Sequence, residues 1–198
     1  MPEWLNSFIL TFIPLFIVVD SLGSLLFLVR AVGDIPKNEQ RRIARTSVIT
    51  AAIVGLAFLF FGKLLLTAMN ISVGSFAIAG GIILLILSIN TLLTGHSVEL
   101  EKEALIAIVP LGTPLLAGPA TITALLILSS QYPIYIVLIS FLLNLLIAWG
   151  IFLGKNRIIK FTGQGGLRAV SNVFNLLLAA IAVSMVFRGL TLLGIISS

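Results

Sequence analysis

The sequence predicts an all-α integral membrane protein, and three observations carry that prediction. Of 198 residues, 59% are hydrophobic and 10% are charged, with a mean hydropathy of +1.21. A soluble domain is roughly 45–50% apolar and about 25% charged. The apolar residues gather in long blocks, and the charged residues stand between them. A soluble fold could not hide so much apolar surface, so lipid is the expected solvent.

Six apolar blocks follow one another along the chain. A helix needs about 20 apolar residues to cross a hydrocarbon core of about 30 Å, and each block has roughly that length. The blocks span residues 5–29, 46–68, 72–93, 104–128, 133–154 and 170–194. The connections are short and no soluble domain is left over. We therefore expect one transmembrane domain, residues 1–198, with six membrane-spanning helices.

The distribution of Lys and Arg predicts the orientation. Most of these residues lie in the links after the first, third and fifth blocks, and only Lys63 and Arg188 lie near the other side. Cytoplasmic loops of membrane proteins carry an excess of Lys and Arg. The three basic links are therefore expected in the cytoplasm, and both termini outside.

The first and fourth blocks are each interrupted by Pro, Gly and polar residues. The first carries the run Asp20–Gly23 and the fourth the run Gly118–Thr121. Because three is an odd number of spans, two copies of a three-span unit would enter the membrane in opposite directions, as in many secondary transporters. We expect two inverted repeats, about residues 1–98 and 99–198, with interrupted first and fourth spans.

Asp20 lies deep in the first block, with apolar residues on both sides. A charged side chain at this depth costs at least about 2.5–3.5 kcal/mol, so it normally faces a protein interior or an aqueous cavity. One interpretation is a ligand for a coupling cation or a substrate ammonium group, with Ser21 and Gly23 beside it. The other is a cap that accepts hydrogen bonds from the backbone of Leu22 or Gly23. The two interpretations are compatible.

Three prolines and two glycines interrupt residues 109–123. Each proline lacks a backbone donor and blocks one helical hydrogen bond. Irregular backbone at membrane depth is tolerated only inside protein or beside water, and its carbonyls and helix N-termini can bind cations and carboxylates. The candidate binding residues are Thr113, Pro114, Gly118, Pro119, Ala120 and Thr121. A kinked helix whose hydroxyls bond back to its own carbonyls is the alternative.

Other polar and small residues are expected to serve packing first. Intramembrane Asn side chains mostly bond between helices, and this is the expected role of Asn90, Asn144, Asn172 and Asn175. Asn90 and Asn144 are kept as secondary binding candidates. The run Ala77–Gly81 places small residues four apart, which lets a second helix approach closely. The glycine-rich run Gly163–Gly166 lacks the context of a phosphate-binding loop and is expected to be a flexible turn.

Several functional classes lack support in the sequence. Cysteine is absent, which excludes disulfides and thiolate metal sites. The formal net charge of +5 is spread over short links, so no nucleic-acid partner is expected. His96 is the only histidine and lacks the spacing of a metal site. No hydrolase motif is present. We therefore expect neither an enzyme nor a bound cofactor.

Five stretches together resemble the MarC family of six-span inner-membrane proteins. Phe16–Gly23 resembles the family's Asp/Asn-Pro-x-Gly region, Asn38–Arg45 its charged first cytoplasmic loop, and Ile78–Leu84 its Ile-Ala-Gly-Gly run. Val109–Pro119 is similar to its most distinctive motif, Pro-Leu-x-x-Pro-x-x-Ala-Gly-Pro, and Gly163–Gly189 to its last link and span. The resemblance covers nearly the whole chain and implies a prokaryotic cell membrane.

Some members of that family are described as transporters of small neutral amino acids such as glycine and alanine. The resemblance implies the same function here. Ser21 departs from the family pattern, because relatives usually carry Pro after the Asp or Asn. Ser21 regains a backbone donor, so the first span is expected to be less sharply broken than in relatives.

These expectations combine into a secondary transporter that works by alternating access and is coupled to a Na⁺ or H⁺ gradient. Its site would lie near the midplane, with the substrate carboxylate at the N–H groups of Gly118–Thr121 and the ammonium at Asp20 or at carbonyls near Thr113. One alternative is a channel. Because Asp20 is the one acidic residue deep in a predicted span, a ring of charges around a pore would require a homo-oligomer. Another is a partner subunit without transport of its own.

Overall fold

The structure is a computed structural model that describes residues 2–25, 36–94 and 116–196. Every regular element in these ranges is helical, which confirms the predicted all-α class there. A short helical stretch, residues 21–25, follows the first helix. The longer helices are α1 (Glu3–Val19), α3 (Lys37–Ala68), α4 (Val73–Thr94), α6 (Pro119–Gln131), α7 (Ile134–Leu153) and α8 (Lys155–Leu192).

Five spans within the described ranges are long and apolar enough to cross a membrane. They are α1 with residues 21–25, most of α3, α4, α7, and the part of α8 from Gly165 onward. These match the first, second, third, fifth and sixth predicted blocks. Helix α6 has 13 residues, fewer than the about 20 that a crossing helix needs. Because residues 104–115 lie outside the described residues, the six-span layout stays a prediction.

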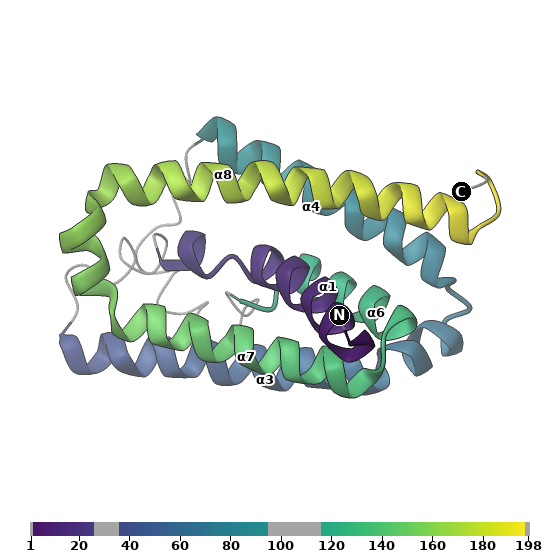
Figure 1. The fold of residues 1–198 in the computed structure, drawn as a ribbon, viewed down its shortest axis with the longest axis horizontal. Helices are drawn as coiled ribbons and strands as arrows, with labels where there is room; N and C mark the ends of the chain where they lie inside the picture. Colours follow the sequence, from purple (N-terminus) through teal and green to yellow (C-terminus); the bar gives the residue numbers. More distant parts are fainter. Residues whose placement is uncertain (1, 26–35, 95–115, 197–198) are drawn as a thin grey trace.

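Two predicted links turned out to be helical. The charged run Asn38–Arg45 forms the first turns of α3, because Glu, Gln, Arg and Ala are strong helix formers and carry the helix beyond its apolar part. The run Gly163–Gly166 is not a flexible turn either. Only Gly163 leaves the helical region, with φ 67°, and the helix continues on both sides. Helix α8 therefore changes direction there, as Figure 1 shows.

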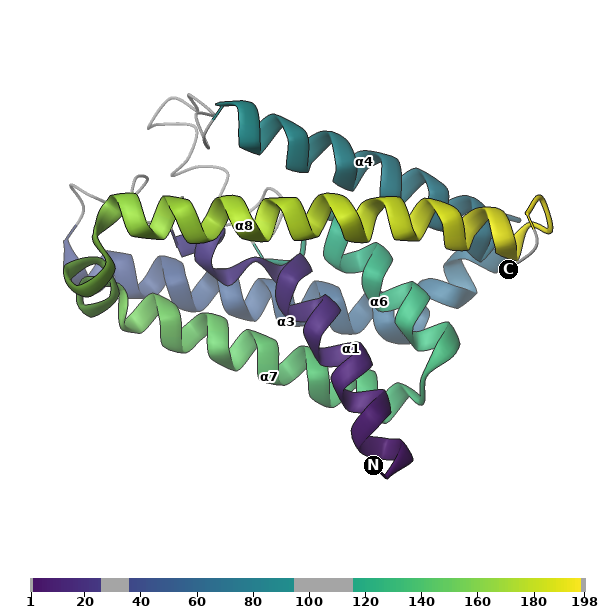
Figure 2. The same ribbon diagram turned by 45° about the horizontal axis from the view of Figure 1, so that its top comes forward.

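The helices form two groups (Figures 1 and 2). Helices α4 and α8 run antiparallel along each other, and α1, α3, α6 and α7 form the second group, in which α6 also packs against α4. Glycines allow the close approach within the α4–α8 pair. A Cβ atom on Gly81 would lie 2.7 Å from the carbonyl oxygen of Ala182, and one on Gly189 would lie 2.6 Å from that of Gly74. The predicted packing role of Ala77–Gly81 is confirmed.

Large apolar side chains cover the outward faces of the long helices. Phe61 of α3 is 64% exposed, Ile86 of α4 60%, Leu146 of α7 57% and Leu176 of α8 60%. Such faces are unstable in water but suit a hydrocarbon solvent. The buried core instead contains Leu15, Leu125, Val137 and Phe141 at its centre. The molecule is therefore a membrane protein whose outer surface contacts the lipid bilayer.

Candidate functional site

The first span breaks at Asp20. This residue adopts the left-handed conformation, with φ 42° and ψ 57°, and ends α1. Its Oδ1 accepts a hydrogen bond of 3.0 Å from the backbone N–H of Gly23, so Asp20 caps the helical stretch that follows. Asp is among the few residues that tolerate the left-handed region, because its short side chain bonds locally. The capping interpretation is confirmed, and it places a carboxylate at the break.

Gly23 must be a glycine for this cap to form. A Cβ atom there would lie 2.1 Å from Oδ2 of Asp20, so any side chain would displace the carboxylate. Ser21 does not line the cavity described below. It is 3% exposed, and its Oγ has no hydrogen-bond partner among the described residues. Of the candidates beside Asp20, Gly23 therefore shapes the site, whereas Ser21 lies behind it.

Helix α6 begins at the second predicted interruption. Gly118 is its N-cap, with extended backbone, and Pro119 is its first helical residue. The first N–H groups of a helix have no partner within the helix, and Gly118 has no side chain to cap them. The N–H groups of Ala120 and Thr121 are therefore available. The Oγ1 of Thr121 donates 2.9 Å to the carbonyl oxygen of Leu116, which fixes the chain before the helix.

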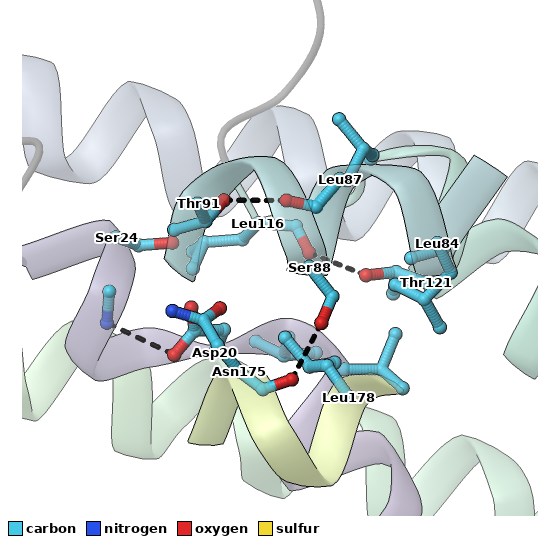
Figure 3. A pocket seen from close by; sticks show the side chains of 15 residues that line it. Asp20, Ser24, Leu84, Leu87, Ser88, Thr91, Leu116, Thr121, Asn175 and Leu178 are labelled. Carbon is cyan, nitrogen blue, oxygen red and sulfur yellow. Dashed lines mark hydrogen bonds between the residues drawn. The ribbon is translucent and has the colours of Figure 1, made fainter. Parts of the chain in front are cut away.

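The break in α1 and the start of α6 meet at one cavity of about 240 Å³. Figure 3 shows its polar residues converging from four helices. Leu84, Leu87, Leu116 and Leu178 give it a largely apolar wall. Its polar and small residues are Asp20, Gly23 and Ser24 after α1, Ser88 and Thr91 of α4, Gly118, Ala120 and Thr121 around the start of α6, and Asn175 of α8.

Ser88 and Thr91 of α4 were not predicted from the sequence, whereas Asn175 of α8 is one of the intramembrane Asn residues that it singles out. Ser88 donates 2.6 Å to the carbonyl oxygen of Asn175 and ties the two helices together at the cavity. Asn175 is 2% exposed, and its Nδ2 has no hydrogen-bond partner among the described residues. The spacing of Leu84, Ser88 and Thr91 places them on one face of α4, which is the signal that could have revealed this wall.

The cavity combines one negative charge with several hydrogen-bond donors. Asp20 is the only charged side chain among the described residues that line it. Two other groups supply hydrogen-bond donors. The N-terminus of α6 carries roughly half a positive charge, and the Nδ2 of Asn175 has no partner among the described residues. A carboxylate attracts an ammonium group or a metal cation, and the amide donors suit a carboxylate or carbonyl. The arrangement is complementary to a small zwitterion.

The remaining predicted residues do not reach this cavity or cannot be placed. Asn144 is buried in α7, where its Nδ2 donates to the carbonyl oxygens of Ser140, at 2.8 Å, and of Phe12 in α1, at 3.3 Å. Its role is packing between helices. Asn90 is exposed and does not line the cavity. The predicted candidates Thr113 and Pro114 lie outside the described residues.

The sequence profile of the MarC family, described as integral membrane proteins, matches residues 5–193. The chain belongs to the MarC family. The UPF0056 membrane protein MJ1677 of Methanocaldococcus jannaschii is 31% identical over 94% of this chain and 97% of its own. The UPF0056 inner membrane protein YhgN of Escherichia coli K12 is 30% identical over the same shares.

A third MarC-family relative is the UPF0056 membrane protein PH0760 of Pyrococcus horikoshii, 26% identical over 96% of this chain. These names give a membrane location and no substrate. No solved structure matches the chain. The cavity and its chemistry therefore carry the functional argument.

Proposed function

We propose that this MarC-family protein is a secondary transporter of small neutral amino acids such as glycine and alanine. Transport is coupled to a Na⁺ or H⁺ gradient and proceeds by alternating access. The single observation that carries this proposal is the cavity where the carboxylate of Asp20, the N-terminus of α6 and the unpaired Nδ2 of Asn175 converge. Interrupted helices that meet at a binding site are typical of secondary transporters.

The substrate ammonium group binds at the carboxylate of Asp20, the only charge among the described lining residues. The substrate carboxylate binds at the N–H groups of Ala120 and Thr121, where a helix N-terminus favours anions. A coupling cation has Asp20 as its natural ligand. Both substrate poles would then be satisfied inside a wall made largely of leucine side chains.

The size of the cavity supports a small substrate. Pockets for drug-sized ligands enclose about 300–1,000 Å³, and this cavity encloses about 240 Å³. Leu84, Leu87 and Leu178 leave apolar wall but no charged group for a substrate side chain. A substrate with a neutral side chain therefore fits this wall better than one with a charged side chain.

The helix contacts also support two inverted three-span repeats. In that arrangement α3 corresponds to α7 and α4 to α8, while α1 corresponds to the span that contains α6. Each of these helices packs against its own counterpart, as expected for units related by a two-fold axis. The break at Asp20 and the start of α6 at Pro119 take equivalent places in the two units.

The cytoplasmic membrane of a prokaryotic cell is the proposed location, as the name of the Escherichia coli relative suggests. Both termini are placed outside by the positive links.

Uptake of labelled glycine and alanine into liposomes that hold the purified protein tests this function. Sodium and proton gradients are imposed separately. The Asp20→Asn variant tests the site, and Glu39→Gln, which neutralises an acid in the first turn of α3, serves as the matched control. Accumulation driven by one gradient, lost in Asp20→Asn and kept in Glu39→Gln, is expected. Flux that neither saturates nor follows a gradient would indicate a channel, and no uptake by folded protein would contradict the proposal.

A further inference from the structure

A second cavity is lined by residues of α1, α6 and α8, three of the four helices that line the binding cavity. It encloses about 160 Å³. Leu10 and Pro14 of α1, Ile127 and Leu128 of α6, and Met185 of α8 are among its lining residues. We call the end of the molecule where both chain termini lie the terminal side (Figure 1). On each of the three helices, the residues that line the second cavity are nearer to the terminal side than those that line the binding cavity.

Both cavities therefore occupy one seam, where α8 faces α1 and α6. Along α8 the binding cavity ends at Leu178, and the second cavity extends to Arg188. Ten helical residues correspond to about 15 Å. At the terminal end of the seam, Nη1 of Arg188 donates 2.6 Å to Oε1 of Gln131 and bridges α8 to α6.

The seam contrasts with the contact between α4 and α8. There the glycines bring the backbones so close that Cβ atoms on Gly74, Gly81 or Gly189 would lie less than 3.0 Å from carbonyl oxygens of the other helix. Interiors packed at this density shift as units and not by continuous deformation. The α4–α8 pair is therefore the closer contact. The seam holds both cavities, and an edge-to-face contact of Phe16 in α1 with Phe174 in α8 crosses it, with ring centroids 5.8 Å apart.

One close contact crosses between the groups at the level that separates the cavities. A Cβ atom on Gly80 of α4 would lie 2.5 Å from Oγ1 of Thr123 in α6. Thr123 lies between Thr121, which lines the binding cavity, and Ala124, which lines the second cavity. The two groups therefore touch closely between the two cavities.

The described connections between the groups carry left-handed residues. Asn70, with φ 56°, lies between α3 and α4, and Gly163, with φ 67°, precedes the long part of α8. Hinges are typically one or a few residues at the ends of elements that absorb changes in φ and ψ. Each helix of the α4–α8 pair therefore has a hinge candidate where it joins the second group.

We propose that α4 and α8 move as one rigid pair against α1, α3, α6 and α7, pivoting at Gly80 and Thr123. The movement opens the seam, so that a solute leaves the binding cavity through the second cavity to the terminal side. The moving unit thus consists of α4 and α8, the third helix of each repeat. The movement therefore differs from one in which a whole repeat rocks against the other. This inference rests on the proposed transport function for the identity of the solute, but the movement itself is measurable without transport.

Spin-label distances test the movement in the intact protein. The chain has no cysteine, so introduced cysteines are the only labelled positions. The pair Tyr135→Cys and Leu192→Cys joins α7 to α8 across the seam, and the control pair Leu93→Cys and Leu192→Cys joins α4 to α8 within the moving unit. All three positions are more than half exposed, so labels there leave the packing intact.

Double electron–electron resonance is then recorded in lipid nanodiscs with and without saturating glycine. The expected result is two distance components across the seam, with weights that glycine changes, and one unchanged component for the control pair. A single, glycine-independent component across the seam would overturn the inference, and so would a change in the control pair as large as that across the seam. Two components that ignore glycine would support the movement and count only against glycine as the solute.

Discussion

Ser88 of α4 donates a hydrogen bond of 2.6 Å to the carbonyl oxygen of Asn175 in α8, while the side-chain Nδ2 of Asn175 has no partner within the described part of the chain. The backbone of Asn175 thus serves packing, and its side chain is left for a ligand. A buried donor without a partner costs about 1–3 kcal/mol, so a ligand that supplies an acceptor gains from it.

Replacing Asn175 with Ala separates these two roles, because the carbonyl oxygen still accepts from Ser88. We expect the KM for glycine to rise about tenfold or more, since a hydrogen bond to a charged group contributes about 1.5–3 kcal/mol. The measurement is initial uptake rate against glycine concentration. Asn172→Ala, at an exposed position one turn earlier on α8, is the matched control and should transport normally. Equal KM values for the two variants would remove Asn175 from the site.

Asp20 allows the charge to be separated from the cap. Asn also caps helices and tolerates the left-handed region, so Asp20→Asn should unfold at the denaturant concentration of the unchanged protein yet lose most glycine uptake. Asp20→Ala loses the cap and places a strained residue at φ 42°. It should be destabilised by about 2–3 kcal/mol, the sum of a lost cap and a left-handed residue. Unfolding by denaturant in mixed detergent micelles measures the stability of both variants, and the liposome assay measures their uptake. Near-normal uptake by Asp20→Asn would show that Asp20 serves only as a helix cap and that its charge is not needed for transport.

The interruptions at Asp20 and at Pro119 could be predicted because the signals are local. A charged residue within an apolar run, and prolines beside glycines, disrupt a helix whatever surrounds them. The left-handed φ of Asp20 and the start of α6 at Pro119 follow from those residues. The two predicted binding segments therefore proved to line one cavity.

The wall formed by Ser88, Thr91 and Asn175 could not be predicted in the same way. In a membrane helix both the lipid-facing and the core-facing sides are apolar, so periodicity reveals little about which side meets protein. Asn172 and Asn175 look equivalent in the sequence, yet one is exposed and the other buried. The close contact between α4 and α8 decides which of them reaches the cavity. Helices α3 and α8 begin before their apolar blocks, because charged and polar residues that favour helices extend each of them beyond its apolar part.

Gly81 is expected to be essential for the α4–α8 pair. In Gly81→Ala the new methyl would lie 2.7 Å from the carbonyl oxygen of Ala182, a backbone atom that cannot rotate away. Overpacking of this kind costs about 1–3 kcal/mol. Gly150→Ala on α7, where nothing lies within 4 Å, is the matched control. The free energy of unfolding in detergent should fall only for Gly81→Ala, and equal stability of the two variants would show that the helices can separate at little cost.

Linking Gln131 to Arg188 should trap the seam closed at its terminal end. These side chains lie 2.6 Å apart, so the Gln131→Cys/Arg188→Cys pair can be joined by a short bifunctional thiol reagent. We expect the linked protein to bind labelled glycine normally but to lose uptake, because α8 can no longer leave α6.

The matched control joins two helices within one group. Thr11→Cys/Ser140→Cys replaces hydroxyls that lie 2.8 Å apart between α1 and α7. Both side chains are fully buried, so the two thiols are joined directly as a disulfide by a mild oxidant, and this link should leave uptake intact. Because the chain has no cysteine of its own, the link can be assigned to the introduced pair in each case. Full uptake by linked Gln131→Cys/Arg188→Cys would mean that solute does not pass between α6 and α8. Loss of uptake in the control as well would mean that the motion is not confined to the seam.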